Sequence, residues 1–157
     1  MASKRTQSLR TFAGLVKAID WYDVSLQAIL ENLKMQSVNR TQSMILVHIA
    51  SGVTRPSEIA REMGTTRQNI HAMAKQLIEQ QIITQVPDPN DGRSKLYVFS
   101  KDGLELRNTV LQILSHLDKE LSNRLGPDTI RALNRALSAD WGEYETTAPN
   151  KLRKSAT

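Results

Sequence analysis

Cysteine is absent from this chain of 157 residues. That absence excludes disulfides, thiolate metal sites and thiol-based redox sensing. Long hydrophobic runs are missing as well, because the longest apolar stretch, residues 44–50, is short and is interrupted by His48. A membrane-spanning helix needs about 20 apolar residues, and no apolar segment follows the basic residues at the N-terminus. We therefore expect a cytoplasmic protein with no membrane partner.

Motifs of catalysis and metal binding are also lacking. The chain has no G-x-S-x-G, no phosphate-binding loop and no metalloprotease helix, so we expect no enzyme. Its histidines, His48, His71 and His116, fall on three different predicted helices. A metal site would need about four well-placed ligands, which this spacing does not suggest. We expect neither a metal nor a cofactor.

The composition that remains is that of a globular protein with a basic surface. Charged residues make up 24% of the chain and hydrophobic residues 39%, over a length that suits one domain. The net charge is +5 and the sequence pI is about 9.7. Such an excess suits a polyanionic partner such as nucleic acid.

Residues 82–103 are the most informative segment, because they predict a β-hairpin. The two arms, Ile82–Val86 and Leu96–Phe99, are rich in β-branched and aromatic residues. Between them, Pro87–Gly92 is dense in turn-forming residues. A helix rich in polar residues precedes the hairpin and another helix follows it, which is the setting of a wing.

Charged residues stand at alternate positions near the tip of this hairpin. Asp91, Arg93 and Lys95 would project to one side of an extended backbone, and Asp91 could hold the Arg93 guanidinium. An arginine held in this way suits the narrow, electronegative minor groove of DNA. The alternative is a solvated tip with ordinary surface charge, and the neighbouring helices favour the first interpretation.

Three short helices are expected before the hairpin. The first opens at an Asn39–Gln42 capping box and runs to about Ala50. The second, Pro56–Met63, is followed by Gly64, and the third spans Thr66–Gln80. Helix, short turn, helix and hairpin is the order of a winged helix-turn-helix.

The helix 66–80 would stand where a recognition helix stands. One face is apolar, whereas Arg67, Gln68, His71 and Lys75 occupy another. No aromatic residue lies on it, which disfavours single-stranded nucleic acid, since such binding relies on base stacking.

Long helices are predicted at both ends of the chain. Apolar residues from Leu9 to Leu33 recur at alternating spacings of three and four, except at Asp23. So long a helix would leave its seam exposed in a lone small domain, which predicts a homodimer. Within the seam, Asp23 could lie at the edge, pair with a basic side chain or specify the register. Further helices are expected over 101–125 and 128–141.

The predicted fold is mainly α (α+β). We expect a single domain over 1–142, with a winged helix-turn-helix lobe over 39–100. The dimerisation lobe would consist of helices within 9–35 and 101–141, and residues 143–157 would form a polar tail.

The order of the helices and two short segments resemble the MarR family of bacterial transcription regulators. The resemblance extends over about residues 9–141. Residues 91–103, D-G-R-S-K-L-Y-V-F-S-K-D-G, are similar to the wing and following helix of that family, and 56–64, P-S-E-I-A-R-E-M-G, to an earlier helix. The resemblance implies a two-fold dimer whose recognition helices enter successive major grooves of a pseudo-palindromic operator. It implies that the wing arginine enters the adjacent minor groove with Asp91 as its orienting partner. The DNA-binding residues would be Thr66, Arg67, Gln68, Asn69, His71, Lys75, Arg93 and Lys95.

Two positions depart from the family pattern. The family often has glycine where Gln81 stands and a basic residue where Gln85 stands. A left-handed backbone at Gln81 would cost about 1 kcal/mol, and Gln85 removes a possible phosphate contact.

Relatives of this kind often bind small aromatic or phenolic ligands between the dimer helices and the winged lobe. In this chain Trp21, Tyr22, Asp23 and His48 are the candidates for such a pocket, with ordinary core packing as the alternative. The sequence thus predicts a bacterial-type, nucleoid-associated repressor that binds double-stranded DNA and whose binding an effector modulates. The alternative function is a winged helix that docks proteins without binding DNA.

Overall fold

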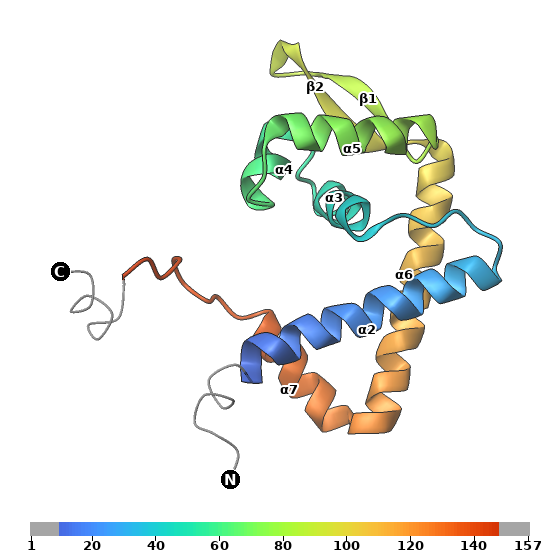
Figure 1. The fold of residues 1–157 in the computed structure, drawn as a ribbon, viewed down its shortest axis with the longest axis vertical. Helices are drawn as coiled ribbons and strands as arrows, with labels where there is room; N and C mark the ends of the chain where they lie inside the picture. The colour runs from blue at the N-terminus through green and yellow to red at the C-terminus, as the bar shows by residue number, and fades with distance from the viewer. Residues whose placement is uncertain (1–9, 148–157) are drawn as a thin grey trace. The chain divides into compact units, whose positions relative to one another are not determined.

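The computed structural model describes residues 10–147, which form a mainly helical fold with a two-stranded antiparallel wing (Figure 1). This confirms the expected fold class. None of the helices described over that range is long and apolar enough to cross a bilayer. The elements are α2 (Arg10–Asn32), α3 (Arg40–Ala50), α4 (Pro56–Glu62), α5 (Arg67–Glu79), β1 (Ile83–Asp88), β2 (Asp91–Phe99), α6 (Lys101–Leu125) and α7 (Pro127–Leu137).

The chain divides into two compact units, residues 1–119 and residues 120–157. The first unit holds α2 to β2 and most of α6, and the second holds the end of α6 and α7. The predicted single domain over 1–142, its two lobes and the tail over 143–157 stay predictions. Leu9, the first residue of the expected seam, and most of that tail lie outside the described residues.

The core of the first unit lies where α3, α4 and α5 meet the wing. In Figure 1 the hairpin lies against α5, with α3 on the opposite side of that helix. Apolar residues recur every three or four positions along these helices, so each turns one stripe inward. The most deeply buried residues include Leu30, Ile45, Ile59, Ile70, Leu77, Ile82, Ile83 and Tyr97, together with Ala74.

The capping box predicted for α3 is confirmed. The Asn39 side chain accepts the Gln42 amide and the Gln42 side chain accepts the Asn39 amide, both at 2.9 Å. Together these bonds satisfy two backbone donors at the start of the helix. Gln42 is 4% exposed, and its Nε2 donates to Gln76 Oε1 at 3.0 Å, which ties α3 to α5.

The helix before the wing ends in a left-handed residue. Gln81 has φ 59°, its amide donates to Ile78 O, and the Ile82 amide donates to Leu77 O, both at 2.9 Å. These paired bonds are a Schellman ending, which favours glycine at the left-handed position. Gln81 therefore keeps the helix ending that a glycine would give, at a conformational cost of about 1 kcal/mol.

The hairpin turn is shorter than the sequence predicted. We expected a turn over 87–92, but Pro87 and Asp88 belong to β1, and β2 begins at Asp91. The reason is a side-chain bond, because Asp88 Oδ1 accepts the Asn90 amide at 2.9 Å and closes the turn locally. Proline is tolerated here because each strand of a two-stranded sheet has a free edge.

The last helix is also shorter than predicted. We expected 128–141, whereas α7 ends at Leu137 with Ser138 as its C-cap. Trp141 lies beyond it, and its indole nitrogen donates to Ala136 O at 2.9 Å. Trp141 has the apolar spacing of the helix stripe, but it bonds a carbonyl near the helix end from outside the helix.

A close backbone contact joins the start of α6 to the start of the wing. The Ser100 hydroxyl donates to Gln81 O and accepts the Gly103 amide at 2.9 Å. A Cβ at Gly103 would lie 1.8 Å from Ile82 O. Only glycine fits there, which gives a physical reason for the S-x-x-G spacing of residues 100–103.

Gly103→Ala should therefore destabilise the protein by several kcal/mol, since backbone rather than a flexible side chain must move to relieve the clash. Gly14→Ala is the matched control, because Gly14 lies inside α2 and a methyl group added there would meet nothing within 4 Å. That change should be neutral or stabilise by up to about 1 kcal/mol. Urea denaturation measures both, and equal midpoints for the two variants would contradict the close contact.

Candidate nucleic-acid interface

The outward face of α5 carries a run of polar side chains. Arg67, Gln68, Asn69, His71 and Lys75 lie on this face, whereas Ile70, Ala74 and Leu77 face the core. Because the buried stripe fixes the rotation of the helix, the polar face points away from the lobe. The structure thus brings the predicted reading residues of this helix together on one surface.

Two of these predicted residues also hold the start of the helix. Thr66 is the N-cap, and its hydroxyl accepts the Asn69 amide at 3.2 Å. Asn69 Nδ2 donates to Thr65 Oγ1 at 3.1 Å. Gln68 takes part in neither of these hydrogen bonds and extends from the same turn of the helix.

At the wing tip, Asp91 orders the backbone that carries Arg93. Its carboxylate accepts the Arg93 amide at 3.1 Å and the Ser94 hydroxyl at 2.7 Å. These bonds lower the pKa of the Asp91 carboxyl, with the Ser94 bond as the larger cause. Among the ion pairs of residues 10–147, none joins Asp91 to the Arg93 guanidinium. Asp91 thus contacts the main chain of Arg93 rather than its guanidinium. The register of the two strands shifts between Pro87 and Asp88, so the strand ladder does not fix the backbone of the tip and the Asp91 side chain does.

The wing is anchored to the helix-turn-helix by a buried carboxylate. The Asp88 side chain is 1% exposed, and its Oδ2 accepts Arg55 Nε at 2.8 Å. Arg55 is the N-cap residue of α4, so this pair ties the turn of the hairpin to the start of that helix. The Arg55 bond, followed by the Asn90 amide, lowers the pKa of the Asp88 carboxyl.

A second link joins the wing to α5 through Tyr97. This β2 residue is 1% exposed, and its hydroxyl oxygen lies 2.7 Å from His71 Nδ1. His71 Nε2 in turn accepts Arg67 Nε at 3.3 Å. Gln85, which pairs with Tyr97 across the hairpin, also hydrogen-bonds the hydroxyl. Burial raises the pKa of Tyr97, while the Gln85 bond and the charge of Arg67 oppose that rise.

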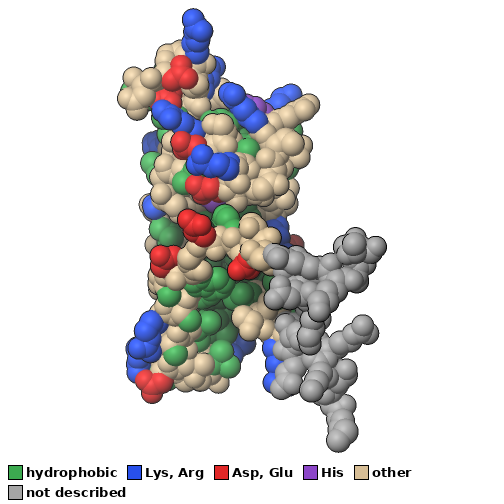
Figure 2. Space-filling model, turned by 90° about the vertical axis from the view of Figure 1, so that its left-hand side faces the viewer, with side chains coloured by type: hydrophobic (Ala, Val, Ile, Leu, Met, Phe, Trp, Pro, Cys, Tyr) green, Lys and Arg blue, Asp and Glu red, His purple; other side chains and the backbone are tan. Residues whose placement is uncertain are grey.

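Basic side chains gather at the end of the unit that carries the wing. Figure 2 shows Lys and Arg at the hairpin tip and over the lobe below it, with Asp and Glu side chains between them. Arg93 and Lys95 are both exposed on β2, and Lys75 is 79% exposed on α5. Lys75 lies 3.9 Å from Glu79 one turn along, a weak surface pair that leaves its ammonium accessible to solvent.

The four candidate effector residues do not form one shared site, since two of them pack against each other and the others pair elsewhere. The Trp21 and Tyr22 rings pack edge to face at 5.2 Å, and the Tyr22 hydroxyl donates to Asp118. Burial and that bond raise the pKa of Tyr22 to about 12. Asp23 lies 3.7 Å from Arg40 Nε, so it has the basic partner that was one of its three expected explanations. His48 Nδ1 lies 3.0 Å from Glu62 Oε2.

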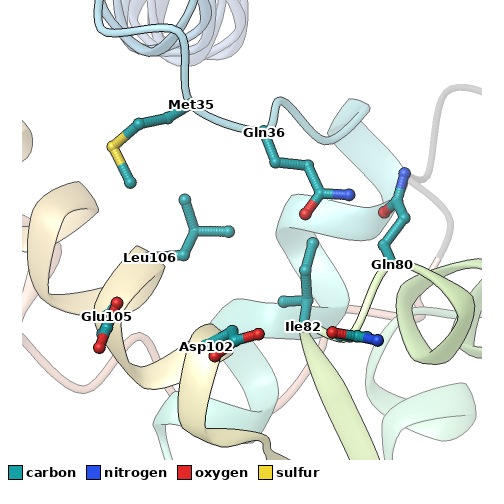
Figure 3. A pocket seen from close by; sticks show the side chains of 8 residues that line it. Met35, Gln36, Gln80, Ile82, Asp102, Glu105 and Leu106 are labelled. Carbon is teal, nitrogen blue, oxygen red and sulfur yellow. The ribbon is translucent and has the colours of Figure 1, made fainter.

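A small cavity lies instead beside the junction of α5, the wing and α6 (Figure 3). Its volume is about 140 Å³. None of the four candidate residues lines it, and the effector pocket stays a prediction. The lining residues are Met35, Gln36, Gln80, Gln81, Ile82, Asp102, Glu105 and Leu106.

Sequence reasoning missed the residues that fix the wing. Arg55 and Asp88 are 33 positions apart, and the pair has no local spacing signal. Tyr97 was placed correctly in a strand, but nothing in the pattern indicated that its hydroxyl meets His71. A buried tyrosine needs a hydrogen-bond partner, and that rule was the available hint.

These observations define a winged helix-turn-helix protein. A family model described as MarR family matches residues 36–94, which include α3 to the first part of β2. The matched segment is thus similar to that family, and the fold of the chain is that of a winged helix-turn-helix protein. Comparison with curated protein sequences gave no match.

Solved structures share the fold at low sequence identity. The transcriptional repressor CouR, bound to a 23-mer DNA duplex, has a TM-score of 0.66 and 20% identity over 88% of this chain and 96% of its own. A mutant of MarR from E. coli, complexed with operator DNA, has a TM-score of 0.63 and 17% identity over 88% and 100%. A transcriptional regulator from Thermotoga maritima gives 0.57 and 21% over 82% and 89%.

The Asp88 anchor makes stability depend on pH. A carboxyl whose pKa is lowered by folding stabilises the protein above its ordinary titration range, and this stabilisation is lost as the pH falls through the lowered pKa. Asp88→Asn should therefore lower the urea midpoint at neutral pH, and its difference from the parent should narrow towards acid pH.

Asp128→Asn is the control for that series, because Asp128 pairs with Arg131 at 91% exposure and screened surface pairs contribute little. Its midpoint should follow that of the parent at every pH. If the difference in urea midpoint between Asp88→Asn and the parent stayed constant down to acid pH, stability would not be linked to the ionisation of Asp88.

Proposed function

We propose that this protein is a homodimeric regulator that binds double-stranded DNA in a sequence-specific way. In this proposal α5 enters the major groove and Thr66, Arg67, Gln68, Asn69 and Lys75 supply its contacts, with His71 between them on the same face. Arg93 enters the adjacent minor groove and Lys95 contacts the backbone, with Asp91 fixing the wing around them. The operator is a pseudo-palindrome with half-sites about one helical turn apart, and the protein works in the cytoplasm at the nucleoid.

One observation carries the proposal above the others. The wing that carries the basic residues is held to the helix-turn-helix by two contacts, Asp88 with Arg55 at the start of α4 and Tyr97 with His71 on the polar face of α5. A surface that reads two adjacent grooves requires a defined distance between helix and wing. A net charge of +5 adds a favourable field for a polyanion.

The exposed half of α2 supports dimerisation. Phe12, Val16 and Ile19 are 70%, 41% and 54% exposed along one seam, while Leu26 and Leu30 further on pack into the core. A seam that is half buried and half exposed suits a second copy of the chain. Two copies would present two α5 helices and two wings to the DNA.

We also propose that the regulator is a repressor whose DNA binding responds to a small molecule. The support is the position of the cavity in Figure 3, which is lined by Gln81 at the end of α5 and Asp102 at the start of α6. A ligand there, or one beside Trp21, Tyr22, Asp23 and His48, would contact elements that position the wing. An aromatic or phenolic ligand remains the predicted chemistry.

Arg93→Ala tests the DNA-binding proposal through its salt dependence. Loss of a guanidinium from a groove should weaken binding to all duplexes and reduce the slope of log affinity against log salt by about 1 per wing. Fluorescence anisotropy with labelled duplexes at several salt concentrations measures this, with Arg131→Ala on α7 as the control. Unchanged affinity and salt slope in Arg93→Ala would contradict the assignment of the wing. If the parent protein showed no salt-dependent binding to duplexes, the alternative function of protein docking would be favoured.

Gln68→Ala should act on specificity rather than on overall affinity. An amide that reads an adenine edge contributes roughly 1–3 kcal/mol at one base pair. Competition with duplexes altered one pair at a time should show this loss at one or two positions per half-site. An equal loss across all positions would assign Gln68 to the phosphate backbone, and Gln112→Ala on α6 serves as the control.

A further inference from the structure

The side chains of Arg67 and His71 form a hydrogen-bonded pair on the outward face of α5. They lie four residues apart, one turn of helix, so both project from the same side. Arg67 Nε donates to His71 Nε2 at 3.3 Å. The guanidinium is therefore held through Nε while its two terminal amino groups remain available.

That hydrogen bond determines the tautomer of the imidazole. A neutral histidine carries one ring proton, and a nitrogen that accepts a bond cannot carry it. Since Nε2 accepts from Arg67, the proton lies on Nδ1, which donates to the Tyr97 hydroxyl oxygen at 2.7 Å. The Tyr97 contact thus keeps Nε2 free to accept.

Tyr97 is suited to fix the position of this imidazole. It is 1% exposed, its backbone amide donates to Thr54 O at 2.9 Å, and its ring packs edge to face on His71 at 6.1 Å. Gln85 on β1 hydrogen-bonds the same hydroxyl. The chain of contacts thus runs from both strands of the wing, through His71, to the guanidinium of Arg67.

We propose that Tyr97 and His71 are positioning residues that orient Arg67 for a two-pronged contact with a guanine edge. This inference rests on the proposed DNA binding. An arginine side chain loses rotamer freedom when it binds, and a guanidinium already held in place loses less. The fork formed by its two terminal amino groups matches guanine O6 and N7. The wing therefore contributes to reading the major groove without touching it.

The first arm of the test needs no DNA. Nitrogen NMR of the full-length protein at mildly alkaline pH should show His71 with its proton on Nδ1. Tyr97→Phe should shift the proton towards Nε2 and change the Arg67 Nε–H signal. Tyr144→Phe removes the same hydroxyl from a residue that is 96% exposed and should change neither signal. An unchanged His71 tautomer in Tyr97→Phe would overturn the relay.

The second arm measures base preference with duplexes altered one pair at a time. Arg67→Ala identifies the pair that Arg67 reads, where discrimination should fall roughly 5- to 150-fold. Tyr97→Phe should lose about threefold or more at that same pair, with an unchanged salt slope. The double variant should lose no more than Arg67→Ala alone.

Two variants of His71 separate the two bonds that it makes. His71→Gln can still accept from Arg67 and should retain more discrimination than His71→Asn, whose shorter side chain can reach Tyr97 but not Arg67. Full discrimination in Tyr97→Phe, or a loss that adds to that of Arg67→Ala, would overturn the positioning role. A parent protein that prefers no duplex would overturn the proposed function, while the NMR arm would still decide the relay.

Discussion

The contact between the Gly103 backbone and the Ile82 carbonyl is the constraint on which the rest of the winged unit depends. At this point α5 ends, β1 begins, β2 ends and α6 starts, so four elements share a few residues of backbone. A methyl group would lie 1.8 Å from the carbonyl oxygen. Ser100 completes the junction by bonding the Gln81 carbonyl and the Gly103 amide. The helix and the wing thus leave the junction in fixed directions.

Two further contacts fix the position of the wing relative to the helices. Asp88 and Arg55 hold the turn of the hairpin against α4, while Tyr97 holds the middle of the wing against α5. Both anchors are buried polar groups with partners, and such groups restrict geometry because any displaced arrangement leaves them unsatisfied. The exposed residues of α5 and the wing therefore form one surface. The proposed reading of two grooves requires this property more than any single side chain.

The sequence predicted the elements well because their signals are local. The Asn39 and Gln42 capping box and the apolar period of α5 each arise within a few residues, and both were confirmed. The predictions failed where a side chain closes a bond that the pattern does not encode. Asp88 shortened the hairpin turn by accepting the Asn90 amide, and Trp141 resembled helix because of its spacing alone.

The predicted site shows the same division. The exposure of Arg67, Gln68 and His71 followed from the period of one helix, and the position of Arg93 followed from the hairpin. The contacts of Arg55 with Asp88 and of His71 with Tyr97 join residues 33 and 26 positions apart. Such pairs depend on how the elements pack, so no short motif could reveal them. Asp91 lay between these cases, since its place was predicted but its partners were not.

Selection of bound duplexes from a random pool, with the full-length protein, tests the central claim most directly. A protein that reads the major groove with α5 and the minor groove with the wing should enrich one pseudo-palindromic site, with half-sites about one helical turn apart. Enrichment of no sequence, or of a site without two-fold symmetry, would contradict the account of a dimer that presents two joined reading surfaces to duplex DNA.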